Sequence, residues 1–392
     1  MTKTNFQTMV PHLQNKLVEI RRHLHEYPEL SRQEFQTSVY IRELLEDADI
    51  SILPSSLETG VIAEIKGNGP VIALRADIDA LPITEETNLP YASKNLGKMH
   101  ACGHDFHTAS ILGAAYLLKQ KETHLKGTVR FIFQAAEENS SGAKDVIKAG
   151  LLNDVTAIFG LHNKPDLSVG TIGITEGPLM ASVDRFEIQI DGKGTHAAAP
   201  HRGIDPIVTA SHIILALQSI VSRSINPLHS AVISVTNLHA RNTWNVIPGT
   251  VTLEGTVRTF QDDVRNTIPE KIRQIIQGVA SALGGIASLH WYPGPPSIQN
   301  DSLLTELCQN AATLNGLSIV DPQPSMAGED FAYYQREVPG FFVFMGTSGT
   351  EEWHHPSFTL DERALSITAH YFATLAEKAL LGLSKSNDFH SS

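Results

Sequence analysis

The sequence predicts an α/β fold with two domains, the smaller inserted into the larger. The chain has 392 residues, which is longer than a chain that folds around a single hydrophobic core usually is. Near both ends of the chain, continuous apolar runs alternate with segments of helical periodicity, as in a sheet that helices cover on both faces. From about Val183, apolar and polar residues alternate one by one, which is typical of strands in a sheet with one face exposed to water.

The larger, metal-binding domain is predicted from residues 1–181 and 294–392, with a central mixed sheet flanked by helices. Ser31 to Glu34 has the spacing of a capping box, which predicts a helix through about Glu46. Buried strands are predicted at 71–74, 128–133, 156–160 and 340–345, and further helices at 108–120, 302–315 and 362–383.

The smaller α+β domain is predicted at residues 182–293. Asp205-Pro206 supplies an N-cap and a proline at the first helical position, which predicts a helix through about Ser222. Strands are predicted at 185–191, 231–238, 250–260 and 286–291, and a second helix at 263–282. The order β-α-β-β-α-β is that of a ferredoxin-like unit. The stretch 292–296, which is rich in proline, is predicted to be a linker.

The acidic composition argues against two classes of partner. The sequence has 30 Lys and Arg against 42 Asp and Glu, a formal net charge of -12, so nucleic acid and anionic membranes would repel it. We expect no membrane-spanning helix and no secretion signal, because no run of 18 apolar residues and no basic start before an apolar block is found. Of the two cysteines, Cys308 has the surroundings of a buried helical thiol, and the expected compartment is the cytoplasm.

Polar groups follow four of the predicted strands of the larger domain. In α/β sheets, ligands bind beyond the carboxyl ends of the strands. If the four strands are parallel, all these groups converge on one edge, and this convergence carries more weight than any single residue. The four segments are Arg75 to Asp79, Glu137-Glu138, His162-Asn163 and Glu351 to Pro356.

A glycine-containing turn before a helix, His100 to His107, adds the ligand types that zinc and other borderline divalent metals prefer. We predict that Cys102 and His104 bind metal, because the other segments supply the remaining ligands. For His100 and His107 we prefer the interpretation that they are ordinary polar residues flanking a helix start.

The adjacent Glu137 and Glu138 would suit a metal-assisted hydrolysis. Neighbours on an extended chain point in different directions, so one can bind metal while the other faces a water molecule. The ion lowers the pKa of that water, and a carboxylate takes its proton and passes it to the leaving amine. Such pairs are more commonly solvated groups at a strand end, and the residues alone leave open which glutamate has which role.

Seven motifs in a fixed order resemble one family. They are Arg-Ala-Asp-Ile-Asp-Ala-Leu-Pro (75–82), His-Ala-Cys-Gly-His-Asp (100–105), Ala-Glu-Glu (136–138), Gly-Leu-His (160–162), Gly-Lys-Gly-Thr-His-Ala-Ala-Ala-Pro (192–200), Asn-Val-Ile-Pro-Gly (245–249) and Gly-Glu-Asp-Phe (328–331). The sequence is similar to the M20 metallopeptidase family. Within it, the sequence resembles the amidohydrolase branch of hippurate hydrolases, N-acyl-amino-acid deacylases and auxin-conjugate hydrolases. The resemblance covers nearly the whole chain, and the second motif is specific to this branch.

The resemblance implies a site with two divalent metal ions, zinc or manganese, with cobalt or nickel as alternatives. It selects His354 over His355, because the family places this histidine two residues before a proline. It implies that Glu137 is the general base and that His196 reaches a neighbouring subunit and steadies the oxyanion. The implied metal ligands are Cys102, His104, Glu138, His162 and His354, and Asn245 and Arg258 match positions near the substrate's polar groups.

The resemblance has limits as well. Many relatives carry a histidine where this sequence has Arg75, and a bridging aspartate where it has Cys102, whose thiolate favours softer metals. On spacing alone, Gly192 to Pro200 would be a turn with an exposed His196, and the resemblance reverses that interpretation. Glu329 and Asp330 match a motif near the site, to which we assign no role.

The predicted function is hydrolysis of the amide bond of an N-acyl amino acid, and the resemblance implies a homodimer formed through the inserted domain. One alternative is a metal-dependent dipeptidase or aminopeptidase, which would need an acidic group to hold the free α-amine, and the sequence identifies none. The other is a metal- or ligand-binding relative without catalysis, against which the presence of both glutamates counts.

Overall fold

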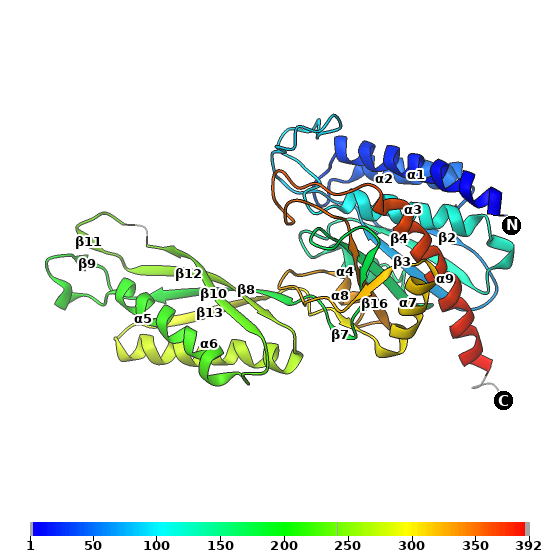
Figure 1. The fold of residues 1–392 in the computed structure, drawn as a ribbon. Coiled ribbons are helices and arrows are strands. Elements are labelled where there is room, and N and C mark those ends of the chain that lie inside the picture. Colours follow the sequence, from blue (N-terminus) through cyan, green and yellow to red (C-terminus); the bar gives the residue numbers. More distant parts are fainter. Residues whose placement is uncertain (1–2, 241, 389–392) are drawn as a thin grey trace. The chain divides into compact units, whose positions relative to one another are not determined.

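The computed structural model describes residues 3–240 and 242–388, with side chains described at 12–240 and 242–384. The chain forms two compact units (Figure 1). The first unit contains the residues up to Gly177, then Gln299–Gln323 and the residues from Asp330 onward; the second contains Pro178–Ile298 and Pro324–Glu329.

The first unit is built on an eight-stranded sheet in the order β1-β2-β4-β3-β5-β16-β6-β15. Its four central strands are parallel neighbours, since β3 pairs in parallel with β4 and β5, and β5 with β16. The pairs β1–β2, β2–β4 and β6–β16 are antiparallel, so the sheet is mixed, as predicted. The strands are β1 (Ser51–Ile52), β2 (Val61–Ile65), β3 (Val71–Asp77), β4 (Thr128–Gln134), β5 (Val155–Lys164), β6 (Thr171–Gly173), β15 (Ser318–Val320) and β16 (Gly340–Gly346).

Helices cover both faces of this sheet (Figure 1). On one face, α3 packs between α1 and α9, and it is apolar almost all round because it is nearly completely buried. Consecutive residues of β5 face opposite sides of the sheet. Phe159 belongs to the core beneath α3, whereas Gly160 lies against Phe331 of α8. The helices are α1 (Lys3–Glu26), α2 (Phe35–Asp47), α3 (His104–Lys119), α4 (Gly142–Lys148), α7 (Ser302–Leu314), α8 (Phe331–Tyr334) and α9 (Ala364–Asp388), with a 3₁₀ turn at Glu122–His124.

The predicted capping box at the start of α2 is wrong. The helix begins at Phe35, and its first turn has no side-chain cap. The Ser31 hydroxyl instead donates to Asp79 Oδ2 at 2.7 Å. The buried Glu34 carboxylate accepts hydrogen bonds from the Thr59 hydroxyl and the Ala136 amide, at 3.0 and 2.8 Å. Both side chains therefore join α2 to strand ends rather than to their own helix.

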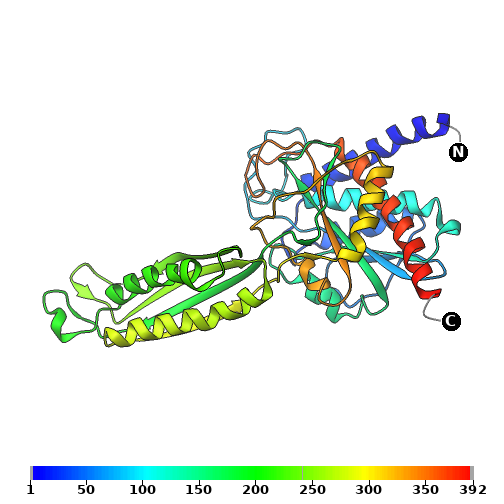
Figure 2. The same cartoon turned by 60° about the horizontal axis from the view of Figure 1, so that its bottom comes forward.

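The second unit contains a four-stranded antiparallel sheet in the order β10-β12-β8-β13. Two helices, α5 and α6, lie together over one face of this sheet (Figure 2). Asp205 Oδ1 accepts from the Ile207 and Val208 amides at 2.9 and 3.3 Å, which confirms the predicted N-cap of α5. The elements are β8 (Ser182–Asp191), α5 (Pro206–Ser219) with a π-helical extension Ile220–Ser224, β10 (Ala231–His239), β12 (Thr250–Thr259), α6 (Asp262–Ala282) and β13 (Ile286–Pro293).

One sequence expectation needs correction in this unit, and a second stands beside a helix that meets the length and composition of a membrane span. Strand β13 continues to Pro293, so the predicted linker at 292–296 begins inside a strand. The helical stretch Pro206–Ser224 is long and apolar enough, by length and composition, to cross a membrane, with 28% of it buried. Its Ile213 and Leu217 lie in the core against the sheet, and a helix that covers a sheet passes the same test, so this is weak evidence for a membrane.

The structure also contains short pairs of strands that are separate from the two larger sheets. Strand β9 (Thr195–His196) pairs with β11 (Val246–Ile247), and β7 (Gly177–Pro178) pairs with β14 (Gln299–Asn300). A 3₁₀ turn, Pro200–Arg202, follows β9.

Candidate functional site

The five predicted metal ligands lie around one edge of the central sheet of the first unit. Register explains this, because Asp77 at the end of β3 is level with Gln134 at the end of β4. His162 is level with Phe344 of β16. Strand β5 is longer than predicted, so His162 lies inside the strand rather than beyond its end. Cys102 and His104 open α3, Glu138 follows β4, and His354 lies in the loop after β16.

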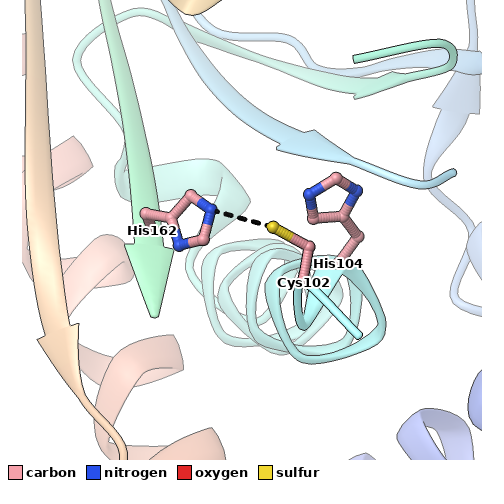
Figure 3. Close-up of side chains that lie close together, drawn as sticks. All are labelled: Cys102, His104 and His162. Carbon is pink, nitrogen blue, oxygen red and sulfur yellow. Dashed lines mark hydrogen bonds between the residues drawn. The ribbon is translucent and has the colours of Figure 1, made fainter. Parts of the chain in front are cut away.

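Three buried side chains form the first potential metal site (Figure 3). The Cys102 thiol points toward the His162 ring, with Sγ 3.5 Å from Nε2. Together with a ring nitrogen of His104, these atoms all lie within 4.8 Å of one another. This is the spacing and the donor set that a borderline divalent ion requires.

Hydrogen bonds fix which nitrogen each histidine offers. His104 Nδ1 donates to the Asp79 carbonyl oxygen at 2.9 Å, and His162 Nδ1 donates to the Asn163 carbonyl oxygen at 2.9 Å. A carbonyl oxygen can only accept, so each Nδ1 carries a proton, and in the neutral ring that binds a metal the lone pair is on Nε2. Within the described residues, His104 Nε2 is buried without a hydrogen-bond partner. Both rings are therefore arranged as metal-binding histidines are.

A second group shares the Cys102 thiol and adds Glu138 and His354, with their polar atoms again within 4.8 Å. Glu138 Oε2 lies 3.6 Å from His354 Nε2, and Oε1 lies 3.8 Å from His104 Nε2. One carboxylate and one thiol thus connect the two groups, an arrangement that suits two neighbouring ions.

The electrostatics of the site favour bound cations. Burial, together with Glu138 and Glu137, raises the pKa of the Cys102 thiol well above its ordinary value. Burial also raises the pKa of Glu138 to about 7. For His104 the effect of burial is outweighed by Asp77 and Asp79, which raise its pKa to about 10. Buried groups that would be anionic are crowded together, and divalent ions would compensate their charge. The residues therefore fit a metal pair.

Glu137 lies beside these ligands but faces different neighbours. It follows the turn at Ala136, whose φ of 57° is unusual for a residue with a side chain. Its Oε1 accepts the Asp330 amide at 3.3 Å, and it groups with His104 and Glu138 within 4.8 Å. It also groups with Glu329 and Asp330 but is in neither group that contains Cys102, so its carboxylate lies beside those two groups rather than within them.

Gly103 allows the turn that brings Cys102 and His104 together. Its φ is 86°, and an added Cβ would lie 2.3 Å from Asn163 Nδ2. Replacing Gly103 by alanine is expected to destabilise the fold by more than the roughly 1–2 kcal/mol that a left-handed residue costs. Gly97→Ala is the matched control, since Gly97 has a φ of 78° but nothing within 4 Å of its added Cβ. Urea unfolding would contradict this prediction if the two variants were equally stable.

The other three predicted site residues lie in the second unit. His196 is exposed on β9, where its Nδ1 accepts the Ala198 amide at 3.1 Å. Asn245 is joined to the same strand pair, because its carbonyl oxygen accepts the Ala197 amide at 2.9 Å. Arg258 lies on β12, where its guanidinium donates to the Val257 carbonyl oxygen at 3.2 Å and burial lowers its pKa. The structure thus brings His196 and Asn245 together and places Arg258 in the four-stranded sheet.

Several supporting residues went unrecognised in the sequence. Asp77 and Asp79 belong to a segment predicted to reach the site, but their role in orienting histidines depends on contacts that spacing does not show. His107 is buried: its Nδ1 donates to Asp77 Oδ1 at 2.6 Å and its Nε2 accepts the Asn163 amide at 2.9 Å. His100 is also buried, at 2% exposure. Both histidines are thus interior residues.

Arg75, the position where many relatives are expected to carry histidine, is a buried ion-pair centre. Its guanidinium contacts Asp77 Oδ2 and Asp330 Oδ1, each at 2.8 Å. Asp330 also accepts from Gln134 and from the Ala143 amide, so this carboxylate is held firmly next to Glu137. Arg75 thereby supports both the Asp77–His107 pair and the segment that contacts Glu137.

Comparison with known proteins gives consistent results. The sequence profile of Peptidase family M20/M25/M40 matches residues 73–378. An N-acetylcysteine deacetylase of Bacillus subtilis is 59% identical over 92% of this chain and 96% of its own length. IAA-amino acid hydrolase ILR1-like 4 of Arabidopsis thaliana is 41% identical over 94% of this chain and 87% of its own length. The crystal structure of the Bacillus subtilis YXEP protein, described as a dinuclear metal binding peptidase from the M20 family, is similar with a TM-score of 0.87 and 55% identity, covering 95% of this chain and 99% of that one.

Proposed function

We infer that this chain, which belongs to Peptidase family M20/M25/M40 and is a metal-dependent amidohydrolase, cleaves the amide bond of N-acyl amino acids. The observation that carries the proposal is the pair of ligand groups that share Cys102, with Glu137 beside them but outside both. The substrate class is supported by relatives named as deacetylases of N-acetylcysteine and as hydrolases of IAA-amino acids. N-acetylcysteine is therefore the first compound to test.

The geometry of the two groups supports the ligand roles. We propose that two divalent ions, zinc or manganese with cobalt or nickel as alternatives, are held by Cys102, His104, Glu138, His162 and His354. Bound there, such ions would lower the pKa of a water molecule and polarise the amide carbonyl. The thiol among the ligands favours the softer of these metals.

Glu137 would move the proton that the reaction requires. It takes a proton from the attacking water, whose oxygen forms a bond to the carbonyl carbon. The C–N bond then breaks, and Glu137 returns the proton to the nitrogen that leaves as the free amine. The products are the carboxylic acid of the acyl group and the amino acid.

We assign the second unit to substrate binding and dimer formation. His196 would stabilise the negative charge that develops on the carbonyl oxygen, while Asn245 and Arg258 would bind the substrate's polar groups. A homodimer through this unit is supported by exposed apolar side chains on α5, namely Ile207, Val208 and Leu215. The order β8-α5-β10-β12-α6-β13 supports a ferredoxin-like domain at 182–293, inserted into a catalytic domain of 1–181 and 294–392. We propose the cytoplasm as its compartment.

A substrate comparison tests the proposal. Protein loaded with zinc or manganese should hydrolyse members of a panel of N-acetyl and N-benzoyl amino acids, N-acetylcysteine included. It should also cleave an N-acetylated dipeptide in preference to the same dipeptide with a free amine. Preference for the free amine would instead establish a dipeptidase or aminopeptidase. Metal binding without turnover of any compound would indicate a relative that has lost catalysis.

A further inference from the structure

The loop that carries His354 is attached to the sheet by the neighbouring residue, Trp353. The indole Nε1 donates to the carbonyl oxygen and to the side-chain Oδ1 of Asn163, at 3.1 and 3.2 Å. The indole ring also packs on the His162 ring, with centroids 4.3 Å apart. Lys164 Nζ lies over the Trp353 indole, 5.0 Å from the ring centroid. Hydrogen bonds, ring packing and a cation therefore hold Trp353 against β5.

Asn163 is the fixed point of this attachment. It is fully buried, and its Nδ2 donates to the Cys102 carbonyl oxygen at 2.6 Å. Its backbone oxygen accepts from His162 Nδ1, and its backbone amide donates to His107 Nε2. One residue thus contacts the Cys102 turn, the His162 ring and the residue next to His354.

His354 itself needs such support. Its side chain is 53% exposed, and its backbone has a φ of 66°, which residues with side chains rarely adopt. The backbone amide donates to the Ala101 carbonyl oxygen at 2.9 Å. An exposed ligand on a strained loop is held in place only if its neighbours hold the loop.

We propose that Asn163 and Trp353 form a clamp, a pair of positioning residues that sets the His354 side of the metal centre. The clamp rests on the proposed function, because it takes His354 as a ligand of the group with Cys102 and Glu138. That group contains His354, whereas the group of Cys102, His104 and His162 does not. Loosening the loop therefore weakens one metal position and spares the other.

Metal binding by Trp353→Phe tests the clamp. Phenylalanine keeps an aromatic ring against His162 but lacks the N–H that reaches Asn163. Residues that support metal ligands typically contribute 10–100-fold in metal affinity, so one of the two ions should bind about 10–100-fold more weakly while the other is unchanged. The measurement is titration of metal-free protein with Zn²⁺ and with Mn²⁺, with the bound metal counted by elemental analysis.

Two further variants separate the clamp from a general loss of structure. Trp291→Phe removes an indole from β13 of the second unit and should leave both affinities at the wild-type value. Asn163→Ala also removes the hydrogen bond to the Cys102 carbonyl oxygen, and Cys102 belongs to both groups, so this variant should weaken both ions. The clamp is overturned if Trp353→Phe leaves both affinities unchanged, or weakens both ions equally. Wild-type protein that binds two ions but cleaves no N-acyl amino acid would refute the proposed function and leave the clamp standing.

Discussion

Glu137→Gln is expected to lower kcat for an N-acyl amino acid by about 10³-fold, within the 10²–10⁴-fold range of general acid–base catalysis. Glutamine has the same shape and can still accept the Asp330 amide through its side-chain oxygen, so the turn after β4 should remain. It cannot take a proton from water at neutral pH. KM should change little, because the substrate's binding groups are elsewhere. Steady-state kinetics and elemental analysis of bound metal check both statements.

The matched control is the neighbouring residue. Glu138→Gln replaces a carboxylate that lies between His104 and His354, at 3.8 and 3.6 Å. It should lose bound metal as well as activity, whereas Glu137→Gln should keep its metal. If the two variants exchanged these properties, the roles of the two glutamates would have to be exchanged as well.

Removing the metal ions by dialysis against a chelator is expected to abolish hydrolysis, and Zn²⁺ or Mn²⁺ should restore it. The reason is chemical: the protein side chains can hold and move a proton, but without a cation little lowers the pKa of the water or compensates the charge on the carbonyl oxygen. Activity that survives with less than one ion in a hundred protein molecules, counted by elemental analysis, would exclude a metal mechanism.

The loss of metal can also be tested at a single predicted ligand, His354, with the adjacent His355 as its control. His354→Ala should lose one ion and most activity, since His354 Nε2 lies 3.6 Å from Glu138. His355→Ala should behave like wild type, because the His355 ring accepts the Ser357 amide and lies 4.0 Å from Glu351. Equal losses in both variants would show that the loop, rather than a ligand, had been disturbed.

The central part of the fold could be predicted because its physical signal is local. Strands β3, β4, β5 and β16 are buried on both faces, so each is a continuous apolar run in the sequence. Their parallel pairing fulfils the condition on which the convergence of the polar segments depended. The capping box failed for the opposite reason: Ser31 and Glu34 have the right spacing, but tertiary partners take their hydrogen bonds.

The support of the site could not be predicted, because it depends on contacts between distant parts of the chain. Asn163 reaches Cys102 across 61 positions, and Trp353 reaches Asn163 across 190. Neither residue type suggests such a role by itself. An asparagine after a predicted strand is common in loops, and a tryptophan in a loop is more commonly a packing residue. His107 likewise resembled a polar residue at a helix start, and only the fold shows that it is buried against Asp77.

The ion pairs of Arg75 have an evolutionary consequence. A single substitution of Arg75 by histidine, the residue expected in many relatives, would remove the guanidinium from both Asp77 and Asp330. Leaving buried charges uncompensated in this way typically costs about 3–5 kcal/mol, a large part of the stability of an ordinary domain. Exchange between arginine and histidine at position 75 by one mutation alone is therefore expected to be strongly destabilising. A lineage could exchange them only if the partners of Arg75 changed first, so these positions should show strong epistasis and vary together.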